Sequence, residues 1–358
     1  MKQIDLYIVR KFLLTFLFMN LLLTMVIVIF DISEKIDDFL ENSVPFKAIF
    51  FDYYLNFIPF MLNMFIGLIT FIAVIYFTSR LAFNTEIVAM LAAGISFRRI
   101  LMPYLVTAFI LAGLSFSLSN FIIPVANEGR IRFELEHMNK HQPGYESFVH
   151  FQIAPGEVIA LQHFDPFSRT GYKSILTSLD TSGVKRVLSA EFIRWDSVQR
   201  KWSMEQYSIR TILPGKELLV NGHKLDTALA ISPDDLTSRI ISVDNLGFRK
   251  LRRFIAESRT RGSENILYYE VEKHKRLAYP FATVILTLIG VSLSSRKVRG
   301  GIGWHIAMGL LASFSYILFM KFTETFAING NLPPPVAVWI PNFLYLMLGF
   351  WLLYKAPK

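Results

Sequence analysis

Side chains that could carry out catalysis are scarce in this sequence. Gly215-Lys216 is followed by Glu217 and not by Ser or Thr, so the phosphate-binding loop G-x-x-x-x-G-K-[ST] of many ATPases is absent. The motifs H-E-x-x-H and G-x-S-x-G are also absent, and the seven His are scattered. Because the chain has no Cys, disulfides, thiolate zinc sites and a Cys nucleophile are excluded. We therefore expect no catalytic residue, no metal and no cofactor, and a protein that is not itself an enzyme.

Charged side chains beside long apolar runs are the first candidates for function. Lys321 and Glu324 lie one helical turn apart near the end of such a run. An ionisable group close to the membrane interior is a functional hypothesis by itself. A gate or lipid contact and a simple mutual ion pair both agree with this spacing. The basic stretch 249–253 (RKLRR) predicts a solvated or headgroup-facing stripe, with a specific site for an anionic ligand as the alternative.

A short helix is predicted at about residues 84–94, between two apolar runs. Asn84 or Thr85 is a suitable N-cap, and Glu86 then falls in the first turn, where the helix dipole favours an acid. One face, at positions i, i+3, i+4 and i+7, holds Ile87, Met90, Leu91 and Gly94, and Gly94 also suits the C-terminal stop. Such a stripe lies on lipid or docks in a groove of another protein, and the pattern alone favours neither.

Six apolar runs are the elements that must position these residues. Hydrophobic residues make up 53% of the 358 residues and charged residues only 18%, against about 25% charge in soluble domains. A helix needs about 20 apolar residues to cross the hydrocarbon of a bilayer. The runs that satisfy this requirement are 12–30, 53–78, 100–127, 277–295, 300–320 and 336–354. The sequence therefore predicts an α-helical polytopic membrane protein whose first span is an uncleaved anchor.

Lys and Arg in the short connecting segments predict the orientation of the spans. The two terminal segments and the short loops at 79–99 and 296–299 hold eleven Lys and Arg, whereas the short loops on the other side of the spans hold only Lys35 and Lys47. Cytoplasmic loops are enriched in Lys and Arg, so both termini and the short helix are expected in the cytoplasm. The net charge of +9 follows from this topology, and we expect no nucleic-acid partner. The basic residues assigned to the inner side are Lys2, Arg10, Lys11, Arg80, Arg98, Arg99, Arg296, Lys297, Arg299, Lys355 and Lys358.

The polar segment between the third and fourth spans predicts a β-rich domain outside the cytoplasm. Short alternating runs separated by turn residues such as Pro155-Gly156 and Asn221-Gly222 are typical of an antiparallel sandwich or roll. Trp195 and Trp202 are expected to face each other across a hairpin, as core aromatics. The predicted strands are 147–154, 158–163, 173–180, 187–195, 201–213 and 217–225. An open roll leaves edge strands that can accept a strand from another protein.

Three parts of the chain follow from these patterns. Residues 1–127 are expected to form spans one to three with the short cytoplasmic helix. Residues 128–276 are expected to form the outer domain, with strands at about 147–231 and a helical return over 244–261 and 263–276. Residues 277–358 are expected to form spans four to six. The predicted fold class is thus six transmembrane helices, arranged three and three, with an inserted β-jellyroll-like domain.

Two stretches of sequence resemble the LptF/LptG family, the permease subunits of the lipopolysaccharide export transporter. The segment T-E-I-V-A-M-L-A-A-G-I-S after the second span matches the family pattern E-[IL]-x-x-M-x-A-x-G through Glu86, Ile87, Met90, Ala92 and Gly94. The segment 272–280 (EKHKRLAYP) resembles the basic entry to the fourth span, which ends in Pro. The order of three spans, outer β domain and three spans extends the similarity to nearly the whole chain.

This resemblance implies a role for each candidate residue. In the family the short helix is the coupling helix that docks on the LptB ATPase, so ATP would be hydrolysed by a separate chain. Glu86 would make an ionic or capping contact in the groove of that ATPase. Basic residues at the outer end of the first span contact lipid phosphates in the family, and Lys35 is the candidate here. The alternative for Lys35 is a local pair with Asp31 at i−4. The apolar side of the coupling contact would come from Ile87, Met90, Leu91 and Gly94.

The resemblance also implies partners and location. A paralogous permease would face this chain around a lipid cavity, to which the Phe- and Leu-rich faces of spans one, two and five would contribute. An LptC-like or LptA-like periplasmic protein would receive lipopolysaccharide from the jellyroll domain. The expected location is the bacterial inner membrane, multi-pass, with both termini cytoplasmic and the large domain periplasmic.

Two other classes of function stay open at this point. An ion-gradient-driven secondary transporter would need buried ionisable residues in mid-span and internal repeats, and apart from Lys321 and Glu324 these features are not evident. A membrane-anchored scaffold or sensor with a binding domain outside would need neither six spans nor a docking helix. Co-purification with a separate ATPase would distinguish an ATP-driven permease from both.

Overall fold

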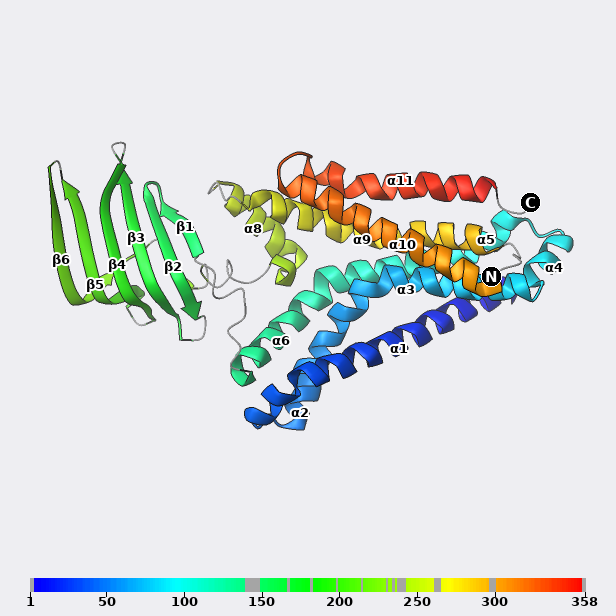
Figure 1. Cartoon of the computed structure of the whole chain (residues 1–358), viewed down its shortest axis with the longest axis horizontal. Helices are drawn as coiled ribbons and strands as arrows, with labels where there is room; N and C mark the ends of the chain where they lie inside the picture. Colours follow the sequence, from blue (N-terminus) through cyan, green and yellow to red (C-terminus); the bar gives the residue numbers. More distant parts are fainter. Residues whose placement is uncertain are drawn as a thin grey trace. The chain divides into compact units, whose positions relative to one another are not determined.

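The computed structural model consists of two compact units (Figure 1). The helical unit comprises Met1–Met138, Asp244–Arg259 and Glu264–Lys358, and the sheet unit comprises Asn139–Val243 and Thr260–Ser263. Five of the basic residues used to predict the topology, Lys2, Arg296, Lys297, Arg299 and Lys358, lie outside the described residues. The structure describes residues 3–138, 149–165, 168–180, 183–197, 199–213, 215–229, 231–233, 236, 243–260, 265–295 and 301–355.

Six helices of the described chain are long and apolar enough to cross a membrane, as the sequence predicts. Several are longer than the apolar runs, because backbone hydrogen bonding continues beyond the first charged residue. The candidate spans are α1 (Gln3–Glu41), Phe46–Phe83, Phe97–Glu134, α9 (Ile266–Ser294), Gly303–Ile328 within α10 (Gly301–Ile328), and α11 (Pro334–Tyr354). Three precede the sheet along the chain and three follow it.

Two of these spans are composite helices with a π-helical segment inside. The second span consists of α2 (Phe46–Ala48), the π-helix η1 (Ile49–Tyr54) and α3 (Leu55–Phe83). The third consists of α5 (Phe97–Ser117), the π-helix η2 (Leu118–Ile122) and α6 (Ile123–His137). The remaining described helices are α4 (Glu86–Ala92), η3 (Val243–Asn245) and α8 (Phe248–Thr260).

Helix α9 is the centre of the helical unit. It packs against α3, α5, α10 and α11. Of the 18 residues in its most apolar stretch 72% are buried, compared with 17% in the corresponding stretch of α1. Small residues allow this packing, because bare backbone lets helices approach closely in a membrane. A Cβ on Gly290 of α9 would lie 3.0 Å from Val74 Cγ1 of α3, and one on Gly309 of α10 would overlap Ile75 of α3. These two glycines therefore fix how closely α9 and α10 approach α3.

The sheet unit contains one antiparallel sheet in the order β1-β2-β3-β4-β5-β6, so each strand pairs with the next along the chain. All six strands match predicted runs; residues 147 and 148 of the first lie outside the described residues. The strands form a meander, and the jellyroll predicted from the sequence is not confirmed. Their bounds are β1 (Val149–Ala154), β2 (Glu157–Asp165), β3 (Thr170–Asp180), β4 (Gly183–Asp196), β5 (Lys201–Leu213) and β6 (Lys216–Thr227).

One face of the sheet carries the core of this unit. Trp195 and Trp202 face each other across the β4–β5 hairpin, as predicted, with ring centroids 5.2 Å apart. Trp202 is fully buried, and its Nε1 donates a hydrogen bond to the carbonyl oxygen of Ile231 at 2.8 Å. Ile159, Leu161 and other alternating side chains pack around it. The period of two along each strand thus places one apolar face inward.

Candidate functional site

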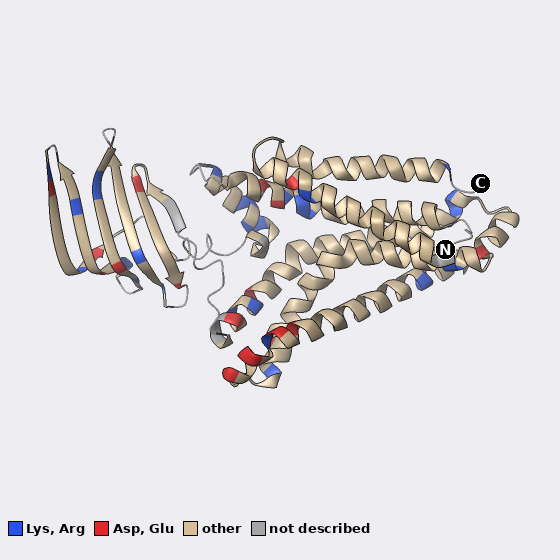
Figure 2. Cartoon of the chain, viewed as in Figure 1, with Lys and Arg blue, Asp and Glu red and all other residues tan. Residues whose placement is uncertain are grey.

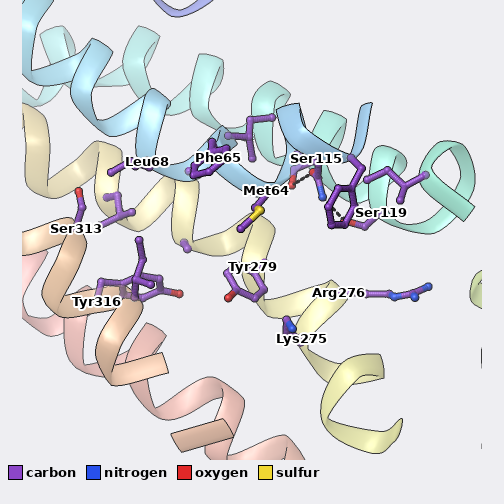
Figure 3. Close-up of a pocket in the computed structure, with 18 of the residues that line it drawn as sticks. Met64, Phe65, Leu68, Ser115, Ser119, Lys275, Arg276, Tyr279, Ser313 and Tyr316 are labelled. Carbon is purple, nitrogen blue, oxygen red and sulfur yellow. Dashed lines mark hydrogen bonds between the residues drawn. The ribbon is translucent and has the colours of Figure 1, made fainter. Parts of the chain in front are cut away.

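A cavity of about 430 Å³ lies within the helical unit (Figure 3). Four stretches of chain form its walls: α3, the α5–η2–α6 helix, α9 and α10. A cavity of this size matches typical ligand pockets and is small for a whole lipid with many chains. Its lining residues are Phe60, Asn63, Met64, Phe65, Ile66, Gly67, Leu68, Ser115, Ser119, Ile123, Glu272, Lys275, Arg276, Tyr279, Ala282, Leu286, Ser313, Tyr316, Ile317 and Lys321.

The wall formed by α3 and α5–η2 is apolar apart from one hydrogen-bonded cluster. Ser115 Oγ donates to Asn63 Oδ1 at 2.8 Å, and Asn63 Nδ2 donates to Ser119 Oγ at 2.8 Å (Figure 3). Polar side chains inside a bilayer bond across helices, because an unsatisfied group in hydrocarbon is costly. Asn63 therefore joins α3 to the third span beside the cavity.

Charge is concentrated where α9 begins its apolar part. Arg276 is buried, and its Nε donates to Glu272 Oε1 at 3.1 Å while its Nη1 donates to the carbonyl oxygen of Leu246 at 2.5 Å. Lys275 Nζ lies 3.2 Å from Glu272 Oε2 and 5.6 Å from the centre of the Tyr279 ring. Along α9 the cavity wall changes from these charges to Ala282 and Leu286. The cavity is therefore amphipathic along its length.

Lys321 and Glu324 lie next to this charged end, on α10. Lys321 Nζ is 3.0 Å from Glu324 Oε2, which confirms the mutual pair that the spacing allows. The side chain of Lys321 is 59% exposed, and Lys321 lines the cavity, whereas the side chain of Glu324 is only 7% exposed. Glu324 Oε1 has no hydrogen-bond partner among the described residues. The pair thus presents its cation toward the cavity and keeps its anion buried.

Lys35 takes part in a separate cluster at the end of α1. Its Nζ lies 2.9 Å from Asp31 Oδ1, so the local pair considered from the sequence is present. The same Nζ contacts the hydroxyl of Tyr53 and lies 4.0 Å from Glu134 Oε1. Only 14% of the Lys35 side chain is exposed. Most of its charge is therefore balanced by its own neighbours.

The predicted short helix is present as α4, with seven residues. Gly94 has φ +83°, and the N–H groups of Gly94 and Ile95 donate to the carbonyl oxygens of Leu91 and Met90. This is the helix stop expected of a glycine in the left-handed region. The predicted side-chain N-cap is wrong: Thr85 has φ +61° and makes no cap bond, and its hydroxyl donates to the carbonyl oxygen of Asn84.

Helix α4 is fastened to the rest of the helical unit by its apolar stripe. Ile87 is 2% exposed and belongs to the core that contains Ile8 and Phe97, and Met90 and Leu91 pack partly against the same core. Glu86 Oε2 accepts a hydrogen bond from the hydroxyl of Tyr7 of α1 at 2.8 Å. The structure thus brings Glu86 to the first turns of α1.

Several residues of these sites were not found from the sequence. Tyr7 is 79 residues from Glu86, and no local pattern connects them. Asn63 has a recognisable sequence signal, since an amide inside an apolar run needs a hydrogen-bond partner. Among the described residues no group of three His, Asp or Glu is arranged to hold a metal ion.

Comparison with known proteins agrees with this architecture. Residues 6–355 match the model of the family described as lipopolysaccharide export system permease LptF/LptG, which confirms the resemblance. Lipopolysaccharide export system permease protein LptG of Haemophilus influenzae is 21% identical over 161 residues, 44% of this chain and 44% of the relative. That alignment spans less than half of the relative's length. Because the family model covers nearly the whole chain, the chain belongs to the LptF/LptG family of lipopolysaccharide export system permeases.

Proposed function

We propose that this chain is the permease subunit of an ATP-driven transporter that extracts lipopolysaccharide from the inner membrane. The observation that carries the proposal is the amphipathic cavity, with Lys275, Arg276 and Lys321 at one end and Phe65 and Leu286 farther along. An amphiphile with an anionic head and acyl chains fits this gradient. Lys275 and Lys321 are the groups assigned to the head, since both line the cavity and Lys321 is 59% exposed, whereas Lys35 does not line it.

An apolar wall is what makes extraction feasible. Each CH2 group removed from hydrocarbon into water costs about 0.8 kcal/mol, so several acyl chains cannot leave the bilayer unless the protein replaces the lipid. The exposed apolar side chains of α1 and α10, such as Phe18, Phe30 and Phe314, offer that replacement. A paralogous permease on the other side would complete an enclosure larger than the cavity of one chain.

Helix α4 is proposed as the coupling helix that docks on a separate LptB-like ATPase. Glu86 would supply the ionic contact, and the exposed side chain of Val88 lies on the outer side of the helix. Ile87 is buried in the core of this chain, while Met90, Leu91 and Gly94 keep part of their surface outward. A displacement of α4 would therefore be transmitted to α1 and α5 through the packing of Ile87 against Ile8 and Phe97.

The sheet unit is proposed to pass lipid to an LptC-like or LptA-like protein. Its last strand, β6, pairs only with β5 among the described strands and is an edge. Leu218, Leu219 and Val220 of β6 are at least half exposed. Edge strands with free backbone groups accept a further strand from a partner. With the termini and α4 in the cytoplasm, this unit lies in the periplasm.

Photocrosslinking tests the lipid site directly. Met64 lines the cavity and is 64% exposed, so a photoreactive amino acid at this position is expected to capture lipopolysaccharide in membranes. Phe109 of α5 is 57% exposed and does not line the cavity, so it is the matched control. A binding preference of about 1 kcal/mol gives about fivefold more adduct at position 64. Equal capture at the two positions would exclude this cavity as the lipid site.

A further inference from the structure

Among the longer described helices, α8 has the strongest segregation of charged and apolar side chains onto opposite faces. Lys and Arg positions recur along α8 (Figure 2). Leu251 and Ile255 are buried, whereas the basic side chains around them are exposed. None of these basic side chains forms an ion pair with a described residue. The exposed basic residues, defined here as the basic face of α8, are Arg249, Lys250, Arg252 and Arg253.

The other side of α8 is held against the start of α9 and the end of the third span. The rings of Phe254 and Tyr269 have centroids 5.0 Å apart, and Arg259 pairs with Glu270. Just before α8, Asn127 Nδ2 donates to Asn245 Oδ1 at 2.8 Å. Contacts at both ends therefore fix which face of α8 points outward.

These contacts also set the height of α8 relative to the bilayer. Arg276, which bonds the backbone of Leu246, directly precedes Leu277, where the apolar part of α9 begins. The far end of α8 pairs with residue 270 of α9, six positions earlier than 276. At 1.5 Å per residue, α8 lies within about 10 Å of the hydrocarbon boundary. That interval covers the headgroup layer, about 5 to 8 Å thick on each side, and its outer edge.

We propose that the basic face of α8 binds the anionic headgroups of phospholipids in the surrounding bilayer. Four cations against one acid, Glu257, on the exposed side of an amphipathic helix at headgroup height complement an anionic membrane surface. The transported lipid is not assigned to this face, because none of the four residues lines the cavity. Binding there would hold the start of α9, the central helix, at a fixed depth. The inference depends neither on lipopolysaccharide transport nor on which side of the membrane is cytoplasmic.

Because the chain has no Cys, a single fluorescent label can be placed on α8. Ala256 is exposed and follows Arg249, Arg252 and Arg253 on the same side of the helix at i+7, i+4 and i+3. The full-length Ala256→Cys chain is labelled and placed in nanodiscs that contain either phosphatidylglycerol or phosphatidylcholine with an acyl-chain spin quencher. Quenching by phosphatidylglycerol is expected to be at least about fivefold stronger than quenching by phosphatidylcholine. The attraction of one basic residue to an anionic surface is worth about 1 kcal/mol, which corresponds to this factor.

Two variants separate charge from packing. With Arg249, Lys250, Arg252 and Arg253 all changed to Gln the quenching ratio is expected to fall to about one, and with the three arginines changed to Lys it is expected to persist. A label on Phe109→Cys, within a span, should show no preference. Equal quenching by both lipids at Ala256→Cys, no quenching by either, or loss of the anionic preference on adding lipopolysaccharide would each overturn the proposal.

Discussion

Replacing Glu86 with arginine is expected to weaken binding of the ATPase by roughly a hundredfold, the equivalent of about 3 kcal/mol for reversing a buried charged contact. The seven residues of α4 place Glu86 in the first turn, next to the exposed surface of the helix. The measurement is a titration of the purified ATPase against the permease complex. Because Glu86 is only half-buried in this chain, the helical unit should keep its melting temperature.

Tyr7→Phe provides the graded control for this prediction. It removes the 2.8 Å hydrogen bond to Glu86 and leaves the carboxylate in place, so ATPase binding should weaken less than in Glu86→Arg. Thr15→Val, elsewhere on α1, should leave binding unchanged, because the hydroxyl of Thr15 donates to the backbone carbonyl oxygen of Lys11 and has no other bond among the described residues. If Glu86→Arg binds the ATPase as tightly as the parent chain, α4 is not docked through this residue.

Arg276→Ala is expected to destabilise the helical unit by about 4 kcal/mol, because it leaves Glu272 buried with less charge compensation. Arg276 is 5% exposed and joins Glu272 to the backbone of Leu246, so the change also removes a bond to the segment before α8. Thermal unfolding of the purified chain in detergent, followed by tryptophan fluorescence, should show a melting temperature lower by about 10 °C.

A double variant distinguishes loss of pairing from loss of packing. Glu272→Gln with Arg276→Met removes both charges and keeps the volume, so it should be more stable than Arg276→Ala. Arg98→Ala on α5 is the surface control, because Arg98 is exposed and has no ion pair among the described residues. A melting temperature of Arg276→Ala equal to that of Arg98→Ala would mean that the buried pair contributes nothing.

The spans could be predicted from the sequence because hydrophobic length is a one-dimensional property. Their ends could not, since α1 continues past Asp31 to Glu41, where a count of apolar residues stops but helical hydrogen bonds do not. The six strands were found through their alternation and turn residues. How that sheet closes is not set by alternation, and the meander leaves the jellyroll unconfirmed.

The candidate site was predictable only where contacts are local. The pair of Lys321 with Glu324 and the pair of Lys35 with Asp31 follow from helical spacing. The bond from Tyr7 to Glu86 crosses 79 residues and depends on how α1 packs beside α4. The predicted N-cap fails for a local reason. The backbone of Thr85 is in the left-handed region, so its side chain does not reach the first N–H groups of α4.

The most direct test of ATP-driven passage through the cavity is the nucleotide dependence of the crosslink at Met64. The chain with a photoreactive amino acid at this position is reconstituted with its partner permease, the ATPase and lipopolysaccharide. The account predicts abundant lipid adduct before ATP is added and a marked decrease after ATP and a periplasmic acceptor are supplied, with no decrease in Glu86→Arg. An adduct that stays constant on ATP addition, with hydrolysis confirmed in the same sample, would contradict it.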